Sequence, residues 1–155
     1  MKKILLILSL LRNTPKIIEE AFRMAQAENA ELLVLFILDT EYADKIVNKL
    51  TNEGWIGGRP SEHFLESLLL EYELQAKSKI QEIKTRAHKL KIPVRSIIKK
   101  GSILEDSLKV TQQEQPHIIL IIRRKRSDLS RIIFGSLVKT LQKKAPCDVK
   151  IIDED

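Results

Sequence analysis

Short runs of consecutive aliphatic residues alternate along the chain with longer segments in which apolar residues recur every three or four positions. Uninterrupted apolar runs are typical of strands that are covered on both faces, as the strands of parallel sheets are. The spacing of three and four is typical of a helix that buries one side. The pattern predicts strands at residues 4–8, 33–38, 94–98, 118–122 and 148–152, and helices within residues 14–29, 61–91 and 103–113, with a short helix after Gly135.

This alternation of strand and helix predicts the fold class. It indicates an α/β protein with a five-stranded, mostly parallel sheet and helices on both faces. A chain of 155 residues has the usual size of one domain, so we expect a single domain over residues 1–155. Ligands of such sheets lie beyond the carboxyl ends of the strands, where the strand order reverses. A functional site is therefore expected at that edge.

Residues that favour helix ends support these boundaries. Thr14 and Pro15 suit the N-cap and the first helical position, because proline lacks the N–H group that would be unpaired there. Asn29 is expected to end this helix, and Pro93 is expected to stop the long helix. We interpret the Lys-Lys-Gly segment at residues 99–101 as a turn after the third strand.

The segment between residues 41 and 60 is the least regular part of the chain. Residues 43–50 fit a short helix, after which the sequence GWIGGRP breaks all periodicity. We interpret Trp55 as a packing residue that pins this loop to the body of the protein. The alternative is a lid or a partner-contact patch, because glycines flank an aromatic residue that is costly to expose.

Composition and charge narrow the setting. With 43% hydrophobic and 31% charged residues the chain is typical of an ordered globular protein, and its net charge of +6 permits anionic partners without demanding them. The single cysteine, Cys147, favours a reducing, cytoplasmic setting and a role as a buried apolar residue. No small-residue cleavage site follows the first apolar run, which is far shorter than the roughly 20 residues that span a membrane. We expect neither a signal peptide nor membrane insertion.

The last strand-helix-strand segment is the best candidate for an anion site. It passes from the fourth strand through the basic residues Arg123, Arg124 and Lys125 to Gly135 and Ser136, where a helix is expected to begin. The first turn of a helix has unpaired backbone N–H groups and partial positive charge, so an anion there is stabilised without a basic side chain.

Five short segments, spread over the whole chain, carry a resemblance to a known family. They are Lys2-Lys3-Ile4-Leu5, Ala30-Glu31-Leu32, Gly101, Phe134-Gly135-Ser136 and Ala145-Pro146-Cys147-Asp148-Val149. The chain resembles the universal stress proteins over essentially its full length. This resemblance implies the adenine nucleotide alpha hydrolase-like, Rossmann-like fold with strand order 3-2-1-4-5. It also implies a homodimer that pairs through the last strand, Asp148–Ile152.

Family members that bind ATP carry the pattern G-x-x-G-x9-G-[ST] after the fourth strand, and this chain departs from it. The two leading glycines are replaced by Ile122 and Lys125, although such glycines let the backbone approach phosphate closely. Ser9 stands where the family has an aspartate at the end of the first strand, and Val138 stands where it has a hydroxyl. Of the family's nucleotide site, only Gly135 and Ser136 remain.

Enzyme chemistry has little support in the sequence. His63, His88 and His117 are scattered singly, with neither the spacing of a metal site nor a matching nucleophile, so we interpret them as surface or packing residues. Asp39 follows the second strand at the expected ligand edge, and we interpret it as a cap of a helix or turn.

These observations predict a non-enzymatic regulatory or interaction module that has no bound cofactor and an unknown protein partner. The alternative is an ATP- or adenine-nucleotide-binding protein in which Arg123, Arg124 and Lys125 replace the glycine cradle, with Ser9, Gly135 and Ser136 at the same site. A third hypothesis is weak binding of nucleic acid or another anion through the same basic residues. It ranks last, because no aromatic residues are interleaved with the basic ones.

Overall fold

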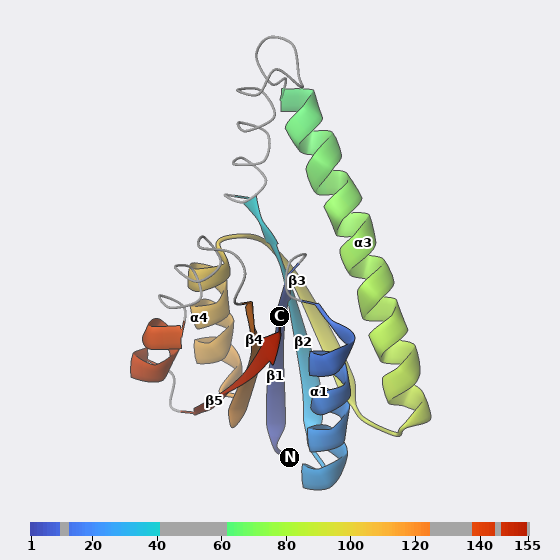
Figure 1. Ribbon diagram of the computed structural model, residues 1–155, viewed down its shortest axis with the longest axis vertical. Coiled ribbons are helices and arrows are strands. Elements are labelled where there is room, and N and C mark those ends of the chain that lie inside the picture. The colour runs from blue at the N-terminus through green and yellow to red at the C-terminus, as the bar shows by residue number, and fades with distance from the viewer. Residues whose placement is uncertain (10–12, 41–61, 125–137, 145–146, 155) are drawn as a thin grey trace.

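The computed structural model describes residues 1–9, 13–40, 62–124, 138–144 and 147–154 (Figure 1). In chain order the elements are β1 (Lys3–Ser9), α1 (Pro15–Glu28), β2 (Glu31–Asp39), α3 (Glu62–Lys89), β3 (Val94–Gly101), α4 (Ile103–Glu114), β4 (Ile118–Arg124) and β5 (Asp148–Glu154). Residues 138–144 are also helical. The expected alternation of strands and helices is therefore confirmed in the described part of the chain.

All strands form one sheet with the order β3-β2-β1-β4-β5. Each neighbouring pair is parallel. The registers place Lys3 opposite Glu31, Ile4 opposite Ile118 and Ile118 opposite Asp148. The α/β class, the parallel sheet and the order 3-2-1-4-5 are thus confirmed.

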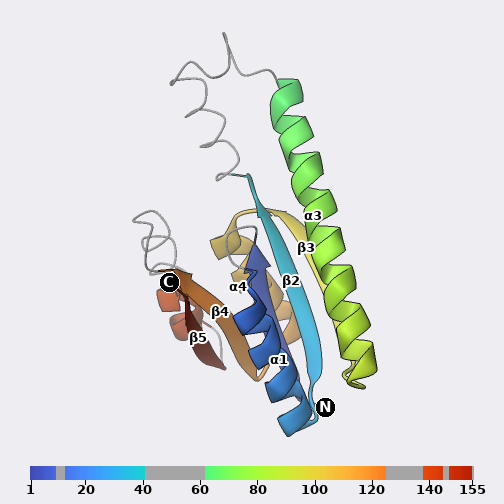
Figure 2. The ribbon, with the colours of Figure 1, turned by 45° about the vertical axis from the view of Figure 1, so that its right-hand side comes forward.

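The aliphatic runs form strands because successive side chains enter two different cores. Ile4, Leu6 and Leu8 of β1 pack on the side of α1 and α3. Leu5 and Ile7 pack on the other side, against α4 and residues 138–144. Figures 1 and 2 show these two layers of helices on opposite faces of the sheet. A strand covered on both faces needs apolar residues at every position, which explains the uninterrupted runs.

The ends of α1 follow the expected signals. Thr14 is the N-cap with an extended backbone, and Pro15 is the first helical residue. The Thr14 side chain does not make the usual capping bond, and its Oγ1 is a buried atom without a hydrogen-bond partner. Asn29 ends the helix with a φ of 50°, a left-handed conformation that asparagine tolerates better than most residues.

The expected turn at residues 99–101 is wrong, because β3 continues through Gly101. The neighbouring strand is the reason: β2 runs on to Asp39, and its register pairs Leu38 with Lys100 and Asp39 with Gly101. Lys99 and Lys100 are exposed, so they suit an edge strand, where charged side chains discourage pairing with another chain.

The long helix α3 buries only part of its predicted apolar stripe. Its inner face is buried at Ala76, Ile80, Ile83 and Ala87. The earlier members of the stripe, residues 65, 69 and 72, are half-buried. Figures 1 and 2 show why: the first turns of α3 extend past the carboxyl ends of the strands.

Some expectations fall on residues outside the described ranges. These are the helix at 43–50, the loop with Trp55, the Ser61 cap, the basic residue Lys125, and the turn at Gly135 and Ser136. Within the described part of the chain, no helix has the length and apolar character needed to cross a membrane.

The two-sided core gives a direct stability test. Leu6 is 0% exposed, whereas Leu90, near the end of α3, is 39% exposed. Leu6→Ala is expected to lower the free energy of unfolding by about 2–5 kcal/mol, because it removes buried methyl groups and leaves a cavity. Leu90→Ala is the matched control and should cost about 0.5 kcal/mol or less. Urea unfolding measures both, and equal losses would contradict the assignment of Leu6 to the core.

Candidate functional site

The strand order reverses between β1 and β4, so the carboxyl ends of these strands flank the position where such sheets bind ligands. Ser9 ends β1, and Arg124 ends β4. The register of these two strands runs from Ile4 opposite Ile118 to Leu6 opposite Leu120, so Ser9 and Arg123 follow the paired residues of their strands. Two of the predicted site residues therefore lie on neighbouring strands at this edge.

Ser9 is almost completely covered. Its exposed fraction is 6%, and its carbonyl oxygen accepts a hydrogen bond of 3.0 Å from Nδ2 of Asn13, which directly precedes the N-cap of α1. A buried serine at this position brings a hydroxyl but no charge to the edge. Compared with an aspartate, it offers one weaker acceptor to a nucleotide.

Ile122 and Val138 are both core residues. Ile122 is 0% exposed and belongs to the core on the side of α1 and α3. Val138 is 8% exposed and belongs to the core on the side of α4. Their side chains pack inside the protein, so neither of them lines an open cavity.

The strand β4 continues past Ile122 as regular structure. Its register with β5 pairs Ile122 with Ile152, Arg123 with Asp153, and Arg124 with Glu154. The first two residues of the basic segment are thus strand residues with acidic neighbours on β5. The remaining predicted site residues, at positions 125, 135 and 136, lie outside the described ranges.

The helix α4 begins at the same carboxyl edge of the sheet, directly after β3. Ser102 is the N-cap of α4, and its side chain accepts a hydrogen bond of 3.4 Å from the backbone N–H of Glu105. The carboxylate of Asp106 lies over Gly101, where an added Cβ would be 2.3 Å from its Oδ2. Two acidic residues in the first turn therefore occupy this helix start and oppose binding of an anion. Sequence reasoning missed Asp106, although a glycine five residues before an aspartate is visible in the sequence.

Comparison with known proteins decides the family. The model of the universal stress protein family matches residues 1–153. The chain belongs to the universal stress protein family. None of the curated protein sequences matches it.

Several solved structures share this universal stress protein fold. Universal stress protein UspA from Lactobacillus plantarum is 18% identical with a TM-score of 0.67, and the match covers 97% of each chain. The hypothetical protein MJ0577 is 22% identical with a TM-score of 0.67, over 99% of this chain and 96% of that one. A universal stress protein family protein from Arabidopsis thaliana with AMP bound is 12% identical with a TM-score of 0.58, over 100% of this chain and 93% of that one. At these identities the likeness establishes the fold.

The histidine at the start of β4 has a structural role at the opposite edge of the sheet. Nδ1 of His117 accepts a hydrogen bond of 3.1 Å from the backbone N–H of Lys3, and Nε2 lies 2.9 Å from Oε2 of Glu28. His88 is exposed on α3. Among the described residues, no group of three or more His, Cys, Asp or Glu is placed to hold a metal ion.

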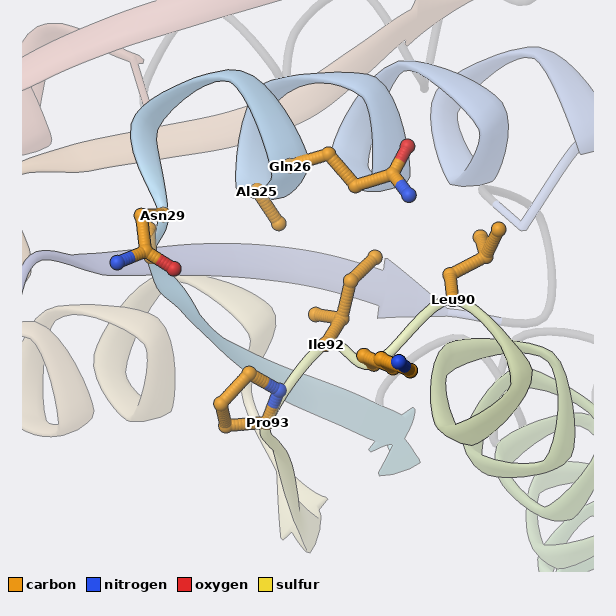
Figure 3. A pocket seen from close by; sticks show the side chains of 8 residues that line it. Ala25, Gln26, Asn29, Leu90, Ile92 and Pro93 are labelled. Carbon is orange, nitrogen blue, oxygen red and sulfur yellow. The ribbon is translucent and has the colours of Figure 1, made fainter.

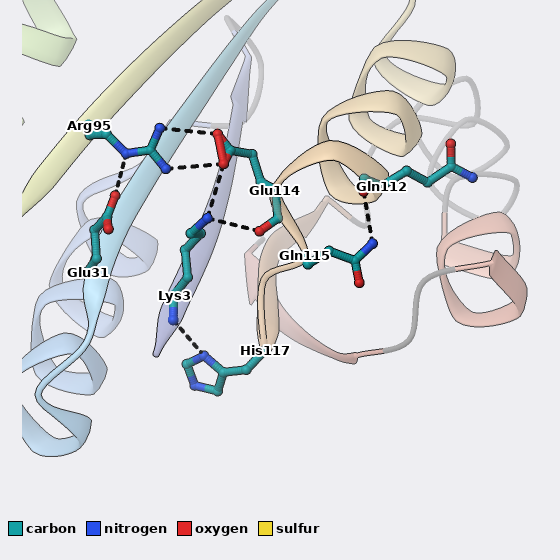
Figure 4. Close-up of polar contacts among 7 residues, drawn as sticks. All are labelled: Lys3, Glu31, Arg95, Gln112, Glu114, Gln115 and His117. Carbon is teal, nitrogen blue, oxygen red and sulfur yellow. Dashed lines mark hydrogen bonds and ion pairs between the residues drawn. The ribbon is translucent and has the colours of Figure 1, made fainter. Parts of the chain in front are cut away.

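An ionic network joins several elements at the amino edge of this universal stress protein (Figure 4). Arg95 pairs with Glu31 and donates hydrogen bonds of 3.1 and 3.2 Å to the two carboxylate oxygens of Glu114. Nζ of Lys3 donates to the backbone oxygen of Glu114 at 2.9 Å and to its Oε2 at 3.1 Å. Arg95, followed by Lys3, lowers the pKa of the Glu114 carboxyl below its usual value. The network ties the end of α4 to three strands.

A shallow pocket lies at the same amino edge (Figure 3). Its volume is about 240 Å³, and its lining includes Gln26 and Asn29 of the first helix end together with Leu90, Lys91 and Pro93. Ligand pockets usually span about 300–1,000 Å³. Asn29 and Lys91 both have left-handed backbone, so the pocket is the space between two helix ends. It lies away from the edge where the family fold places ligands.

The network predicts a pH-dependent contribution to stability. A carboxyl with a lowered pKa in the folded state stabilises the fold above its unfolded value of about 4.3, and the contribution disappears as the pH falls through the folded value. Glu114→Gln should therefore lower the free energy of unfolding by about 1 kcal/mol at pH 7. Urea unfolding at several pH values should show this difference shrinking in acid. A difference that is constant down to about pH 2 would contradict the ionic origin.

Proposed function

We propose that this universal stress protein is a non-enzymatic regulatory or interaction module that does not bind ATP in the usual family manner. The observation that carries the proposal is the burial of Ile122 at the position of the first glycine of the family pattern. We also propose a cytoplasmic location. In support, the sequence has a single cysteine and therefore cannot form a disulfide within the chain.

The burial of Ile122 matters because of what a glycine does there. A glycine lets the backbone turn away from the strand and approach the phosphates closely. Ile122 instead stays in the strand, pairs with Ile152 on β5 and fills the core. Val138 removes a hydroxyl from the same edge, and Ser9 removes a negative charge. Three changes at separate points of the chain thus act in the same direction.

A second candidate function is nucleotide binding through basic side chains. It is favoured by Arg123 and Arg124, which β4 carries to the carboxyl edge of the sheet, and by the AMP bound to the Arabidopsis protein. Guanidinium groups bind phosphate with two parallel hydrogen bonds and need no glycine. The register neighbours Asp153 and Glu154 oppose it, because they bring negative charge to the same strand ends.

A nucleotide assay separates the two candidates. Protein purified without added nucleotide and then denatured is expected to release no stoichiometric ATP, AMP or cyclic AMP. Addition of ATP should leave the melting temperature unchanged, whereas a ligand at 100 times its Kd adds about 2.7 kcal/mol. For a domain of this size that stabilisation would raise the melting temperature by about 5–10 °C.

Two variants show where any nucleotide binds. If nucleotide is released or the melting temperature rises, Arg123→Ala and Arg124→Ala decide how it binds. A loss of binding in these variants would establish the basic segment as the site. Unchanged binding would mean that the nucleotide sits in the family manner, and the proposed function would then be wrong.

We further propose that the protein forms a homodimer through Asp148–Ile152 of β5. This strand is one edge of the sheet, and half-buried Val149 and Ile151 lie along it. The opposite edge, β3, carries exposed basic residues, which discourage strand pairing. Of the two sheet edges, β5 is therefore the better template for a second copy.

The dimer is tested by adding charge to β5. Ile151→Lys should give a folded monomer at tens of micromolar, because a two-fold axis brings two added lysines to the same interface. Light scattering gives the mass, and circular dichroism verifies the fold. The matched control is Ile97→Lys on β3, a residue that is also half-buried and packs on the same core. A monomeric wild type, or a dimer that is equally sensitive to both changes, would contradict this interface.

A further inference from the structure

The outer face of α3 carries an exposed stripe that runs from Ser67 to His88 and contains no formally charged residue. We call it the α3 stripe, and its members are Ser67, Leu70, Leu74, Ser78, Gln81, Thr85 and His88. Successive members are three or four residues apart, so they lie along one side of the helix. Leu70 is 58% exposed and Leu74 is 55% exposed.

Such a stripe is unusual on a helix of this composition. A surface helix normally places its charged residues opposite its buried face. Here Ala76, Ile80 and Ile83 bury the inner face, whereas the charged residues stand beside the stripe on both flanks. Depletion of charge at the centre, with charge at the rim, is typical of protein interfaces.

The charged residues of α3 are divided by sign along the length of the helix. The N-terminal half, residues 62–75, holds only acidic charges, at positions 62, 66, 71 and 73. The C-terminal half holds basic charges at positions 77, 79, 84, 86 and 89, with Glu82 as its single acidic residue. The helix is therefore complementary to a copy of itself that runs in the opposite direction.

We propose that two copies of this protein associate through antiparallel packing of α3 against α3, with the α3 stripe at the seam. A two-fold axis that passes between Ser78 and Gln81 sets Leu74 opposite Thr85 and places the acidic half of each helix along the basic half of the other. Alternation of three and four residues is the spacing of antiparallel and parallel coiled coils alike. A parallel pair would place like charges together, and the charge division therefore selects the antiparallel one.

Two flanking residues define this register. Glu71 and Lys89 are 18 residues apart, which is about five helical turns, so both lie on the same side of the stripe. In an antiparallel pair, flanks on the same side meet, and Glu71 of one copy lies beside Lys89 of the other. Lys77 lies near the crossing point, where basic residues of the two copies come close together. Its own pairing with Glu73 at 3.5 Å offsets this repulsion.

The position of α3 leaves this face accessible. The helix packs on β2 and β3 through its inner side, and Figures 1 and 2 show its outer side turned away from the sheet. The β5 edge lies at the other end of the strand order. Pairing through α3 is therefore independent of pairing through β5, and a protein that uses both surfaces forms assemblies larger than a dimer.

Charge reversal tests the proposal. The background for this test is Ile151→Lys, which removes the β5 contact and is expected to be a monomer at tens of micromolar. At low salt and at higher protein concentration, sedimentation equilibrium should still detect self-association of this variant. Glu71→Lys and Lys89→Glu should each weaken it about tenfold, because each change creates two like-charge contacts across the two-fold axis. The double variant should restore it, because both contacts become attractive again. Added salt should weaken the wild-type association.

The control variant matches the change in net charge. Glu105→Lys changes the net charge of the protein as Glu71→Lys does, but at an exposed position on α4, and should leave the association unchanged. A second test of the seam is Leu74→Lys, which should also weaken the association. The proposal is overturned if the background variant is monomeric at all concentrations, if the double variant stays as weak as the single ones, or if Glu105→Lys acts equally.

Discussion

Aliphatic side chains on both faces of β1 and β2 are completely removed from water, and the rest of the molecule is arranged around that burial. From Ile4 to Leu8 and from Leu32 to Leu38, no side chain is more than 1% exposed. Full burial of one such side chain stabilises a protein by about 1.5–3 kcal/mol, so these two strands are the largest single source of stability. Burial on both faces requires a layer of helices on each side of the sheet. The right-handed crossover connections of a parallel sheet place helices there.

The burial of apolar side chains extends to the carboxyl edge of the sheet, where it opposes ligand binding. A nucleotide site needs strands that stop early and a backbone that can approach phosphate, whereas core burial favours long strands and branched side chains. Ile122 is a core residue, and β4 continues to Arg124 in register with β5. The start of α4 is filled in a different way, by the carboxylate of Asp106 over Gly101. The sheet keeps the strand order of the family. At its carboxyl edge, however, Ile122 and Asp106 pack against other parts of the protein.

The sequence predicted the parts of this structure that depend on neighbours along the chain. Periodicity located the described strands and helices, and Thr14, Pro15 and Asn29 marked the ends of α1 correctly. It failed where pairing between strands decided the outcome, as at Lys100, which β2 holds in the sheet. It also could not reveal that the first turns of α3 extend past the strands, because the apolar spacing is the same along the helix. The pairing of Arg95 with Glu114 joins residues that are close only after folding.

What distinguishes this chain is how its charge is distributed over its surfaces. The β3 edge carries the exposed Arg95, Lys99 and Lys100, whereas Lys150 of β5 is half-buried and pairs with Glu20 of α1. The helix α3 separates acidic from basic charges along its length and leaves Leu70 and Leu74 exposed. Single surface charges contribute little to stability, so a consistent pattern over 28 residues of helix has no evident purpose in folding. It has one in selecting partners, because opposite charges at the rim of an interface determine orientation and exclude alternatives. The interaction role proposed above rests on this combination of core residues at the carboxyl edge and divided charge along the outer helix.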